Sequence, residues 1–433
     1  MKDKLGTFDA VAIIVGIVLG SGIFVAPAGV ALASGGLLVA SVLWIAGAAI
    51  ASCGALSYAE CASRLPKDGG FFVYYRSAYG PWLAFTGGWA AQLVTYPASI
   101  AAIAHVCAQY IAALFPGLEL ETAWVAIAAI ALSGGLNGLG LKSGAWAQRV
   151  LTAVKVIALS GLCVAAVWSA DGSALAVEVA QPENHFLMLL AALPILLWAY
   201  DGWSDVSMIA GAVRDPGRTL VRAVVVSMVV LAGLYIMVQW AVLLVLPLEV
   251  ASHSESVFAD AARAALGPGA GRLVAALVVV STFGSLHGVI FTVSRLGSSM
   301  AQTGDFFRWF APLDVKRGVP LRSLGLIVAA SCVYAAIGNF QYLLALFTQT
   351  VWIFYGLTGV ALLLFRMRGT GAAFAVKVPT AAPLVLIAAA VVMTGSLAHG
   401  NPSRFFLGLS MVSLGIPVFL MWRRFGVQPT AES

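Results

Sequence analysis

Long stretches without any Asp, Glu, Lys or Arg alternate with short charged segments along the whole chain. The charge-free stretches cover residues 10–59, 77–118, 122–141, 223–248, 273–294, 323–365, 378–403 and 405–422. Because a membrane-spanning helix needs about 20 apolar residues, the longest stretches hold two helices each, separated by Gly, Pro or Asn. We therefore predict twelve transmembrane helices, at 9–32, 37–63, 80–113, 122–138, 146–169, 187–211, 222–246, 273–300, 322–338, 341–365, 380–398 and 405–422.

The composition agrees with this pattern and excludes several classes of protein. Of the 433 residues, 61% are hydrophobic and 10% are charged, whereas soluble domains have about 45–50% and about 25%. A soluble enzyme, a disordered tail and a nucleic-acid-binding protein are excluded. The first apolar run is too long for the h-region of a cleavable signal peptide. We expect one transmembrane domain, residues 1–433, whose main surroundings are the lipid bilayer.

The basic residues predict the orientation in the membrane. There are 24 Lys and Arg against 18 Asp and Glu, and most of the basic residues lie on alternate loops between the predicted helices. The positive-inside rule places these loops in the cytoplasm. Both termini are then cytoplasmic, and the protein is a multi-pass protein of the inner (cytoplasmic) membrane. Lys155 is the exception, because it lies inside a predicted span.

Cysteine and histidine give no sign of metal or redox chemistry. No pair of histidines has the spacing of metal ligands, so we expect neither a metal nor a cofactor. A membrane-embedded enzyme would need a cluster of His, Asp, Glu or Cys within the spans, and the sequence shows none. No predicted outer loop contains a cysteine, so a disulfide-linked partner subunit is not expected. The five cysteines lie in apolar segments: Cys53, Cys61, Cys107, Cys163 and Cys332.

Two predicted spans carry residues that interrupt an apolar helix. The first contains Gly20-Ser21-Gly22, and the sixth contains Asp201-Gly202, at corresponding places in two groups of five helices. Glycine permits a break and a close approach of a ligand to the backbone. Matching interruptions in two halves indicate the binding site of a transporter. Half-helix N-termini suit a carboxylate and the opposite ends suit an ammonium, so the pair predicts a site for a free amino acid. A channel would not need two such breaks.

The same residues resemble the amino acid–polyamine–organocation superfamily, specifically the light subunits of heteromeric amino acid transporters (the L-type family) and their bacterial relatives. The resemblance covers nearly the whole chain. It rests on an ordered series of motifs: Gly20–Phe24, Tyr58–Glu60, Leu65-Pro66, Gly69-Gly70, Tyr74-Tyr75, Trp198–Trp203, Arg214–Pro216, Arg218-Thr219, Ser281–Ser285, Ser294–Leu296, Phe347-Thr348 and Trp352.

This resemblance implies an all-α LeuT-type fold that works by alternating access. Two inverted five-helix repeats, at about 9–169 and 187–365, would be followed by two peripheral helices at about 380–422. The implied activity is sodium-independent exchange of L-amino acids, neutral ones among them. A proton-coupled amino acid symporter of the same fold is the alternative, with Lys155, Glu60 or Asp201 carrying the proton.

The resemblance also assigns substrate-binding residues. Ser21, Gly22 and Ile23 would bind the substrate carboxylate at the start of the second half of the first helix. Trp198 would be the aromatic gate over the substrate, and Trp352 an aromatic residue lining the site. Backbone carbonyls at both breaks would bind the ammonium: Val18, Leu19, Trp198, Ala199 and Asp201.

Lys155 matches the family's lysine on the fifth helix, which lies where sodium-coupled relatives bind sodium. A buried ammonium needs carbonyl, hydroxyl or carboxylate partners, and we expect them at the first helix break and at Ser281. Its positive charge would then replace the ion as a strut between the first, fifth and eighth helices. The alternative is a lysine that extends to the cytoplasmic face.

Three acidic residues stand out within this pattern. Asp201 could bind a cationic side chain, cap the broken helix or pair with Lys155. Asp205 lies one helical turn further on, where the family usually has an uncharged residue. This difference leaves the identity of the substrate undetermined. Glu60 lies beside Arg64, and we favour a structural ion pair there over proton coupling. Residues 253–266 are amphipathic and predict a helix in an outer loop.

Overall fold

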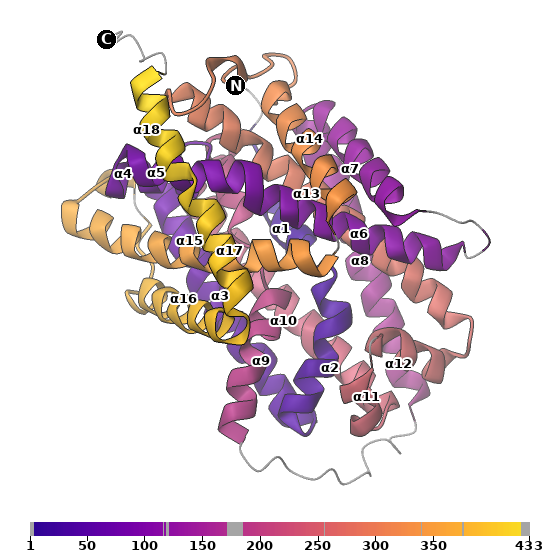
Figure 1. The fold of residues 1–433 in the computed structure, drawn as a ribbon. Helices are drawn as coiled ribbons and strands as arrows, with labels where there is room; N and C mark the ends of the chain where they lie inside the picture. The colour runs from indigo at the N-terminus through magenta and orange to yellow at the C-terminus, as the bar shows by residue number, and fades with distance from the viewer. Residues whose placement is uncertain are drawn as a thin grey trace.

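The computed structural model describes residues 4–115, 117, 121–170, 185–254, 256–338, 340–374 and 376–425. These residues form helices and turns, together with one isolated parallel bridge between Leu5 and Val213 (Figure 1). The helices are α1 (Thr7–Val18), α2 (Gly22–Ser34), α3 (Leu37–Arg64), α4 (Phe71–Tyr79), α5 (Pro81–Ala90), η1 (Ala91–Thr95), α6 (Tyr96–Leu114), α7 (Thr122–Gly138), α8 (Leu141–Ser169), α9 (His185–Ala199), η3 (Asp205–Ala212), α10 (Pro216–Val245), α11 (Leu248–His253), α12 (Val257–Leu266), α13 (Ala270–Gln302), η4 (Arg308–Phe310), α14 (Leu321–Ile337), α15 (Phe340–Arg368), η5 (Ala372–Phe374), α16 (Ala381–Gly400), α17 (Pro402–Ser413) and α18 (Gly415–Phe425).

The helices confirm a multi-pass membrane protein. Among the described residues, 8 helical runs are long and apolar enough to cross a membrane, and the bent pair α1–α2 raises the number to 9. The helices α7 and α14 are apolar but shorter, and α9 ends at the second predicted break. Every segment predicted to span the membrane therefore coincides with a helical segment, while the count of twelve spans and the LeuT-type topology remain predictions.

Proline interrupts two of the predicted spans. The span at 80–113 contains a π-helical turn, η1, directly before Pro97 on α6. Proline has no backbone N–H and its ring collides with the carbonyl four residues earlier, so the regular α-helical hydrogen bonding is disrupted in the turn before Pro97, where η1 lies. The span at 405–422 is divided between α17 and α18 near Pro417. The predicted helix at 253–266 is confirmed over most of its length by α12, and its position in an outer loop stays a prediction.

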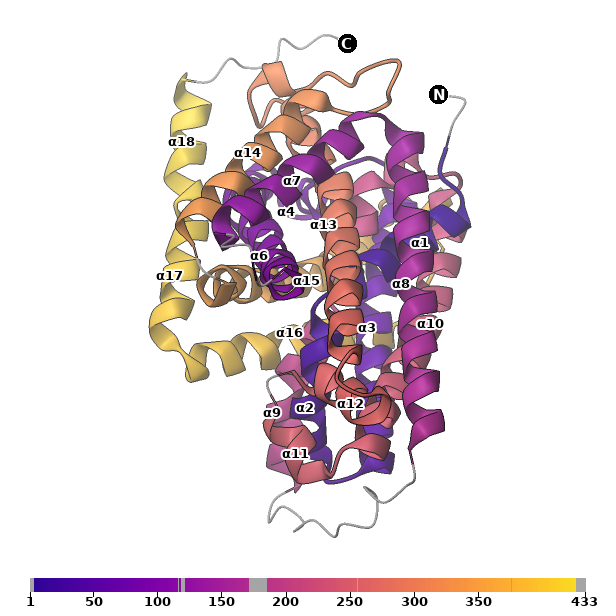
Figure 2. The ribbon, with the colours of Figure 1, turned by 90° about the vertical axis from the view of Figure 1, so that its right-hand side faces the viewer.

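The long helices lie in two directions. Helices α8, α10 and α13 run side by side, and α6 and α15 cross them (Figures 1 and 2). Helix α1 packs inside this arrangement, in contact with α8, α10 and α13. Helices α17 and α18 lie on the outside of the molecule (Figure 2). The start of α1 and the end of α18 lie at the same end of the molecule, opposite α11 and α12 (Figure 2).

A buried ion-pair cluster closes one end of α3. The carboxylate of Glu60 accepts hydrogen bonds from Arg64 at 2.8 Å, from Arg366 of α15 at 2.5 Å, and from the backbone N–H of Val378 at 2.9 Å. The Glu60 side chain is inaccessible to solvent. The predicted structural ion pair is thus confirmed, and it also joins α3 to α15 and to the segment before α16.

Candidate functional site

The two predicted breaks are present, and they touch each other. Helix α1 ends at Val18 and α2 begins at Gly22, with an angle of 59° between them. Helix α9 ends at Ala199 and is followed by a turn before η3. A Cβ added to Gly22 would lie 3.0 Å from the Cα of Ala199, so a larger residue would push the two backbones apart by a few tenths of an ångström, whereas glycine permits the close approach. The breaks, far apart in sequence, therefore form one site.

A second glycine fixes the other side of this contact. Gly202 has a φ of +106°, a conformation that side chains with a Cβ rarely adopt. A Cβ there would also lie 2.6 Å from Cγ2 of Ile17 on α1. The turn after α9 can therefore pack against α1 only with glycine at this position.

Tyr235 of α10 connects the carbonyls of the two breaks. Its hydroxyl lies 2.8 Å from the oxygen of Ala199 and 3.2 Å from the oxygen of Val18. A hydroxyl has one proton to donate, so it bonds one of these carbonyls at a time. This role could not be predicted from the sequence, because Tyr235 lies in an uninterrupted apolar span.

Lys155 of α8 is fully buried on the other side of the first break. Its Nζ donates to the carbonyl oxygens of Gly16 at 2.5 Å, Leu19 at 2.9 Å and Ser281 at 3.1 Å. The hydroxyl of Ser285 lies 3.4 Å from Nζ. The expected contacts with the helix break and with Ser281 are present. They connect α8, α1 and α13.

The hydroxyls of α13 strengthen this connection. Ser281 Oγ donates to the Leu19 carbonyl at 2.7 Å, and Ser285 Oγ donates to the Gly16 carbonyl at 3.0 Å. Ser285 lies one helical turn after Ser281, so both hydroxyls face α1. The unpaired carbonyls that a broken helix leaves at its C-terminal end are thus satisfied by α8 and α13.

A cavity of about 80 Å³ lies between the two breaks, helix α13 and the crossing helices α6 and α15. Five of the predicted substrate-binding residues line it: Val18, Ser21, Gly22, Trp198 and Asp201. Its remaining polar side chains belong to Tyr96 and Ser99 of α6, Asp205 of η3, Ser285 of α13 and Tyr355 of α15. The cavity therefore combines helix ends, aromatic rings and two carboxyl groups.

Tyrosine hydroxyls hold both carboxyl groups of the cavity. Tyr355 donates to Asp201 at 2.6 Å, and Tyr96 donates to Asp205 at 3.0 Å. Ser204 donates to Asp205 at 3.3 Å and lies 3.2 Å from the Tyr355 hydroxyl. Asp201 is thus bonded to a tyrosine, and the ammonium of Lys155 is bonded to carbonyls, so the pairing of Asp201 with Lys155 that the sequence left open is not made.

The other predicted substrate-binding residues lie behind the cavity wall. Leu19, Ile23 and Ala199 are buried among the helices, and the carbonyls of Leu19 and Ala199 accept the bonds described above. Trp352 packs edge-on against Tyr355, with ring centroids 5.4 Å apart. Tyr355, like Phe347, is an aromatic residue of α15 that lines the cavity. The sequence did not identify Tyr355 as a lining residue. It lies three residues beyond Trp352, and helical spacing alone does not tell which of the two faces the cavity.

Comparison with known proteins agrees with this geometry. The sequence profile of the family described as amino acid permease matches residues 5–416 of the chain. The human b(0,+)-type amino acid transporter 1 is 29% identical over 396 residues, which cover 89% of this chain and 80% of the relative.

Two further relatives come from a bacterium and a mammal. The serine/threonine exchanger SteT of Bacillus subtilis is 26% identical over 425 residues, 97% of this chain and 96% of the relative. The Asc-type amino acid transporter 1 of Mus musculus is 28% identical over 439 residues, 98% of this chain and 82% of the relative.

Proposed function

The chain belongs to the amino acid permease family of the amino acid–polyamine–organocation superfamily, and from that premise we propose that it exchanges L-amino acids across the cytoplasmic membrane by alternating access. It is a membrane transporter of amino acids and not an enzyme. The observation that carries the proposal is the contact between the two helix breaks at a cavity. Exchange is the activity named for the bacterial relative SteT.

The cavity offers complementary partners for the backbone of an amino acid. Helix α2 starts at Gly22, so the N–H groups of Ser21, Gly22 and Ile23 lie at the positive end of its dipole and bind the carboxylate. Helices α1 and α9 end at Val18 and Ala199, and their negative ends attract the ammonium. Of the predicted ammonium-binding positions, Val18, Trp198 and Asp201 line the cavity whereas Leu19 and Ala199 do not. We therefore assign the ammonium to the main-chain carbonyls of these three lining residues.

Aromatic residues complete the proposed site. A Cβ added to Gly22 would lie 3.6 Å from the ring of Trp198. The ring is thus next to the start of α2, where we propose that it acts as the gate over the substrate. Trp352 supports Tyr355 from behind, and Tyr355 presents its hydroxyl to Asp201. The substrate side chain then occupies the space beside Phe347 and Leu344 on α15.

Sodium independence is proposed from the contacts of Lys155. Its ammonium is surrounded by three carbonyl oxygens and the Ser285 hydroxyl, and oxygen ligands of this kind are those that bind hard cations. A fixed positive charge therefore takes the place of an ion between α1, α8 and α13. Ser281 contributes twice, through its own carbonyl to Lys155 and through its hydroxyl to Leu19.

The proposed topology follows the predicted one. The two repeats comprise residues 9–169 and 187–365, the peripheral helices residues 380–422, and both termini face the cytoplasm. All five cysteines lie within helices α3, α6, α8 and α14, which supports transport without a disulfide-linked partner subunit. Equal migration of the purified chain on gels with and without reductant is expected, and a reductant-sensitive complex from native membranes would contradict it.

The test of exchange is uptake of a radiolabelled amino acid into proteoliposomes. Uptake should require unlabelled amino acid inside and should not respond to a sodium gradient or a pH gradient. The second candidate function is a proton-coupled symporter. The observation that supports it is the presence of two carboxyl groups in the cavity, because a carboxylate can accept a proton. Uptake into empty vesicles when the outside is acidic would establish that alternative and reject exchange.

The two carboxyl groups also favour a substrate with a cationic side chain. A scan of alanine, leucine, arginine and cystine as competitors identifies the preferred class. Asp201→Asn should weaken competition by arginine by roughly tenfold and change that by alanine little, since a charged partner strengthens a buried hydrogen bond. An equal loss for arginine and alanine would show that Asp201 serves the substrate backbone or the helix end instead.

A further inference from the structure

The two carboxyl groups of the transport cavity belong to one hydrogen-bonded chain. Tyr355 of α15 donates to Asp201 at 2.6 Å, and its hydroxyl oxygen lies 3.2 Å from Oγ of Ser204. Ser204 donates to Oδ1 of Asp205 at 3.3 Å, and Tyr96 of α6 donates to the same oxygen at 3.0 Å. Two hydroxyl groups, from Tyr355 and Ser204, therefore connect Asp201 to Asp205.

This chain has one proton too few while both carboxyl groups are ionised. Its three contacts between oxygens, at 2.6, 3.2 and 3.3 Å, each need a proton between the two oxygens. The two hydroxyls supply one proton each. A proton on Asp201 completes the set, because Tyr355 can then donate to Ser204 while Ser204 still donates to Asp205. A proton on Asp205 completes it in the opposite direction. The chain is thus suited to two carboxyl groups that share one proton.

The side chains packed around the aspartate pair, Asp201 and Asp205, are uncharged phenols at neutral pH. Helix α6 contributes Tyr96 and α15 contributes Tyr355. Tyr58 of α3 packs edge-on against Tyr355, with ring centroids 5.9 Å apart. Helices α1, α2 and α13 contribute no titratable side chain to the described lining of the cavity, and none of the described lining residues is basic.

Lys155 is the buried cation beside this region, but its charge is directed elsewhere. Its ammonium donates to carbonyls of α1 and α13, and it contacts the cavity lining through the hydroxyl of Ser285, at 3.4 Å. The aspartate pair therefore has no cationic side chain beside it among the described residues. Two carboxylates in one buried site repel each other, so that a proton shared between them is favoured.

We propose that the aspartate pair holds one proton when the cavity contains a neutral amino acid, and releases it to water when a cationic side chain binds. The inference rests on the proposed exchange function and adds a second ligand, the proton, to the same site. The charges balance, because the pair carries one negative charge with the proton and two without it, and the guanidinium of arginine cancels one of the two. The loaded cavity then has the same net charge with arginine as with alanine.

Asp205 is the residue that creates this coupling. A single carboxylate at Asp201 would be neutralised by arginine with no proton to release. With the pair, external arginine enters while alanine and one proton leave, so the exchange moves no net charge. Alanine exchanged for alanine carries a proton in each direction and stays independent of a pH gradient, as the proposed function requires.

Uptake of radiolabelled arginine into proteoliposomes loaded with alanine tests the proposal. A gradient of about one pH unit, acidic inside, should raise the final ratio of internal to external arginine by roughly tenfold, because one proton leaves for each arginine that enters. A membrane potential set with potassium and valinomycin should have no effect. Uptake that follows the potential and ignores the pH gradient would overturn the proposal.

Alanine–alanine exchange in the same vesicles separates the two levels of inference. Its absence would reject the proposed function together with this coupling. Its presence, with arginine that is not transported or is transported without a response to pH, would reject the coupling alone.

Asp205→Asn should reverse the behaviour of arginine–alanine exchange. The variant keeps the shape of the side chain and leaves one carboxylate, so uptake should ignore the pH gradient and rise with a potential that is negative inside. The matched control Glu249→Gln removes an exposed carboxylate on α11, outside the cavity lining, and should behave as the wild type does. Unfolding temperatures verify that both variants are folded. A pH response retained by Asp205→Asn would contradict the role of the pair.

Titration calorimetry on the wild type gives a test that needs no variant. Measured in two buffers with different ionisation enthalpies, binding of arginine should release about one proton and binding of alanine none. The affinity for arginine should weaken as the pH falls, because protons compete with the guanidinium for the pair, whereas the affinity for alanine should stay constant. Equal proton release with both amino acids, or release with neither, would overturn the proposal.

Discussion

Lys155 shows how a single residue can hold three helices together. A lysine has three protons to donate, and three carbonyl oxygens lie within 3.1 Å of its Nζ. Two of these belong to the interrupted end of α1, where no helical N–H reaches them. These hydrogen bonds therefore reduce two costs at once, the cost of burying an ammonium and the cost of leaving buried carbonyls unpaired. This pairing requires both the break and the lysine.

Replacing Lys155 should remove these hydrogen bonds and weaken the contact between the three helices. In Lys155→Ala, the carbonyls of α1 and α13 lose their charged donor, and a hydrogen bond to a charged group contributes about 1.5–3 kcal/mol. The Ser281 and Ser285 hydroxyls still bond α1 to α13, but α1 is no longer fixed to α8. Exchange in proteoliposomes should fall by roughly tenfold or more, and the unfolding temperature should drop. The exposed loop residue Lys316 offers the control Lys316→Ala, which should match the wild type. Wild-type exchange by Lys155→Ala would remove the strut from the mechanism.

At the scale of elements, glycine decides where the helices may approach. Gly22 and Gly202 are the positions at which the two broken helices come together, and at both an added Cβ has no room. Glycine at a break thus has two functions, because it allows the chain to leave the helix and the partner backbone to come close. The cavity forms where both helices are interrupted and their backbones also come close to each other.

Gly202→Ala should disturb the site more than an ordinary glycine substitution. The left-handed backbone alone costs roughly 1–2 kcal/mol with a Cβ, and Ile17 stands in the way of the new methyl group. Substrate binding, measured by thermal shift with added amino acid, should weaken or vanish. Gly161→Ala on α8, where a Cβ meets nothing within 4 Å, should keep wild-type binding. Comparable behaviour of the two variants would show that the turn after α9 is more adaptable than its packing indicates.

The ion-pair cluster of Glu60 is expected to contribute to stability, because it joins α3 to α15 and to the segment before α16. Glu60→Gln removes the charge that faces Arg64 and Arg366 and leaves both guanidinium groups uncompensated, which costs about 3–5 kcal/mol for a buried pair. The unfolding temperature of the purified protein should therefore fall. The dependence of uptake on pH should stay as in the wild type, because Glu60 is part of a structural pair. A changed pH profile with normal stability would instead identify Glu60 as a proton carrier.

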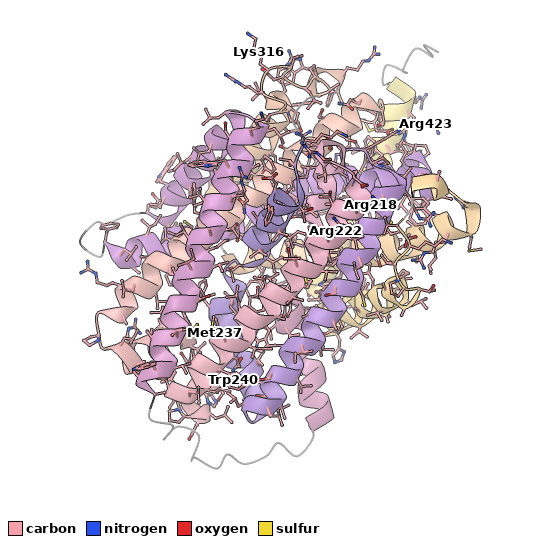
Figure 3. All side chains as sticks on the ribbon, turned by 180° about the vertical axis from the view of Figure 1, so that it is seen from behind. Arg218, Arg222, Met237, Trp240, Lys316 and Arg423 are labelled. Carbon is pink, nitrogen blue, oxygen red and sulfur yellow. The ribbon has the colours of Figure 1, made fainter. Side chains whose placement is uncertain are left out.

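At the scale of the whole molecule, the charges separate its two ends. Lys316 and Arg423 lie toward one end, and Arg218 and Arg222 lie nearer to that end than Met237 and Trp240 do (Figure 3). Helix α1 begins and α18 ends at this end (Figure 2). Helices α11 and α12, with acidic residues in their first turns, lie at the other end. The positive-inside rule applied to this arrangement places the basic end in the cytoplasm.

Cysteine labelling checks this orientation. In a background with the five native cysteines replaced, a membrane-impermeant maleimide should label Glu249→Cys on α11 in intact cells. Lys316→Cys, in the loop before α14, should be labelled only after the membrane is opened. Both positions are exposed, so a difference in labelling reports sidedness and not burial. The reverse pattern would invert the topology.

The sequence by itself determined the features that depend on neighbouring residues along the chain. Apolar stretches long enough to span a bilayer, glycines that interrupt them and a lysine within a span are all local properties, and they predicted the helices, both breaks and the importance of Lys155. The ion pair of Glu60 with Arg64 was also predictable, since residues four apart meet on one helix face.

The tertiary structure decided which of these groups meet, because contact between distant segments depends on how the helices cross and rotate. Lys155 and Ser281 are 126 residues apart, and helical periodicity fixes the face of each helix but not the helix it faces. Packing therefore chose Tyr355 over Trp352 as the lining residue, gave Tyr235 the position between the two breaks, and directed Asp201 to a tyrosine. It also brought Arg214 to Leu5, where main-chain hydrogen bonds join the segment before α1 to the segment after η3.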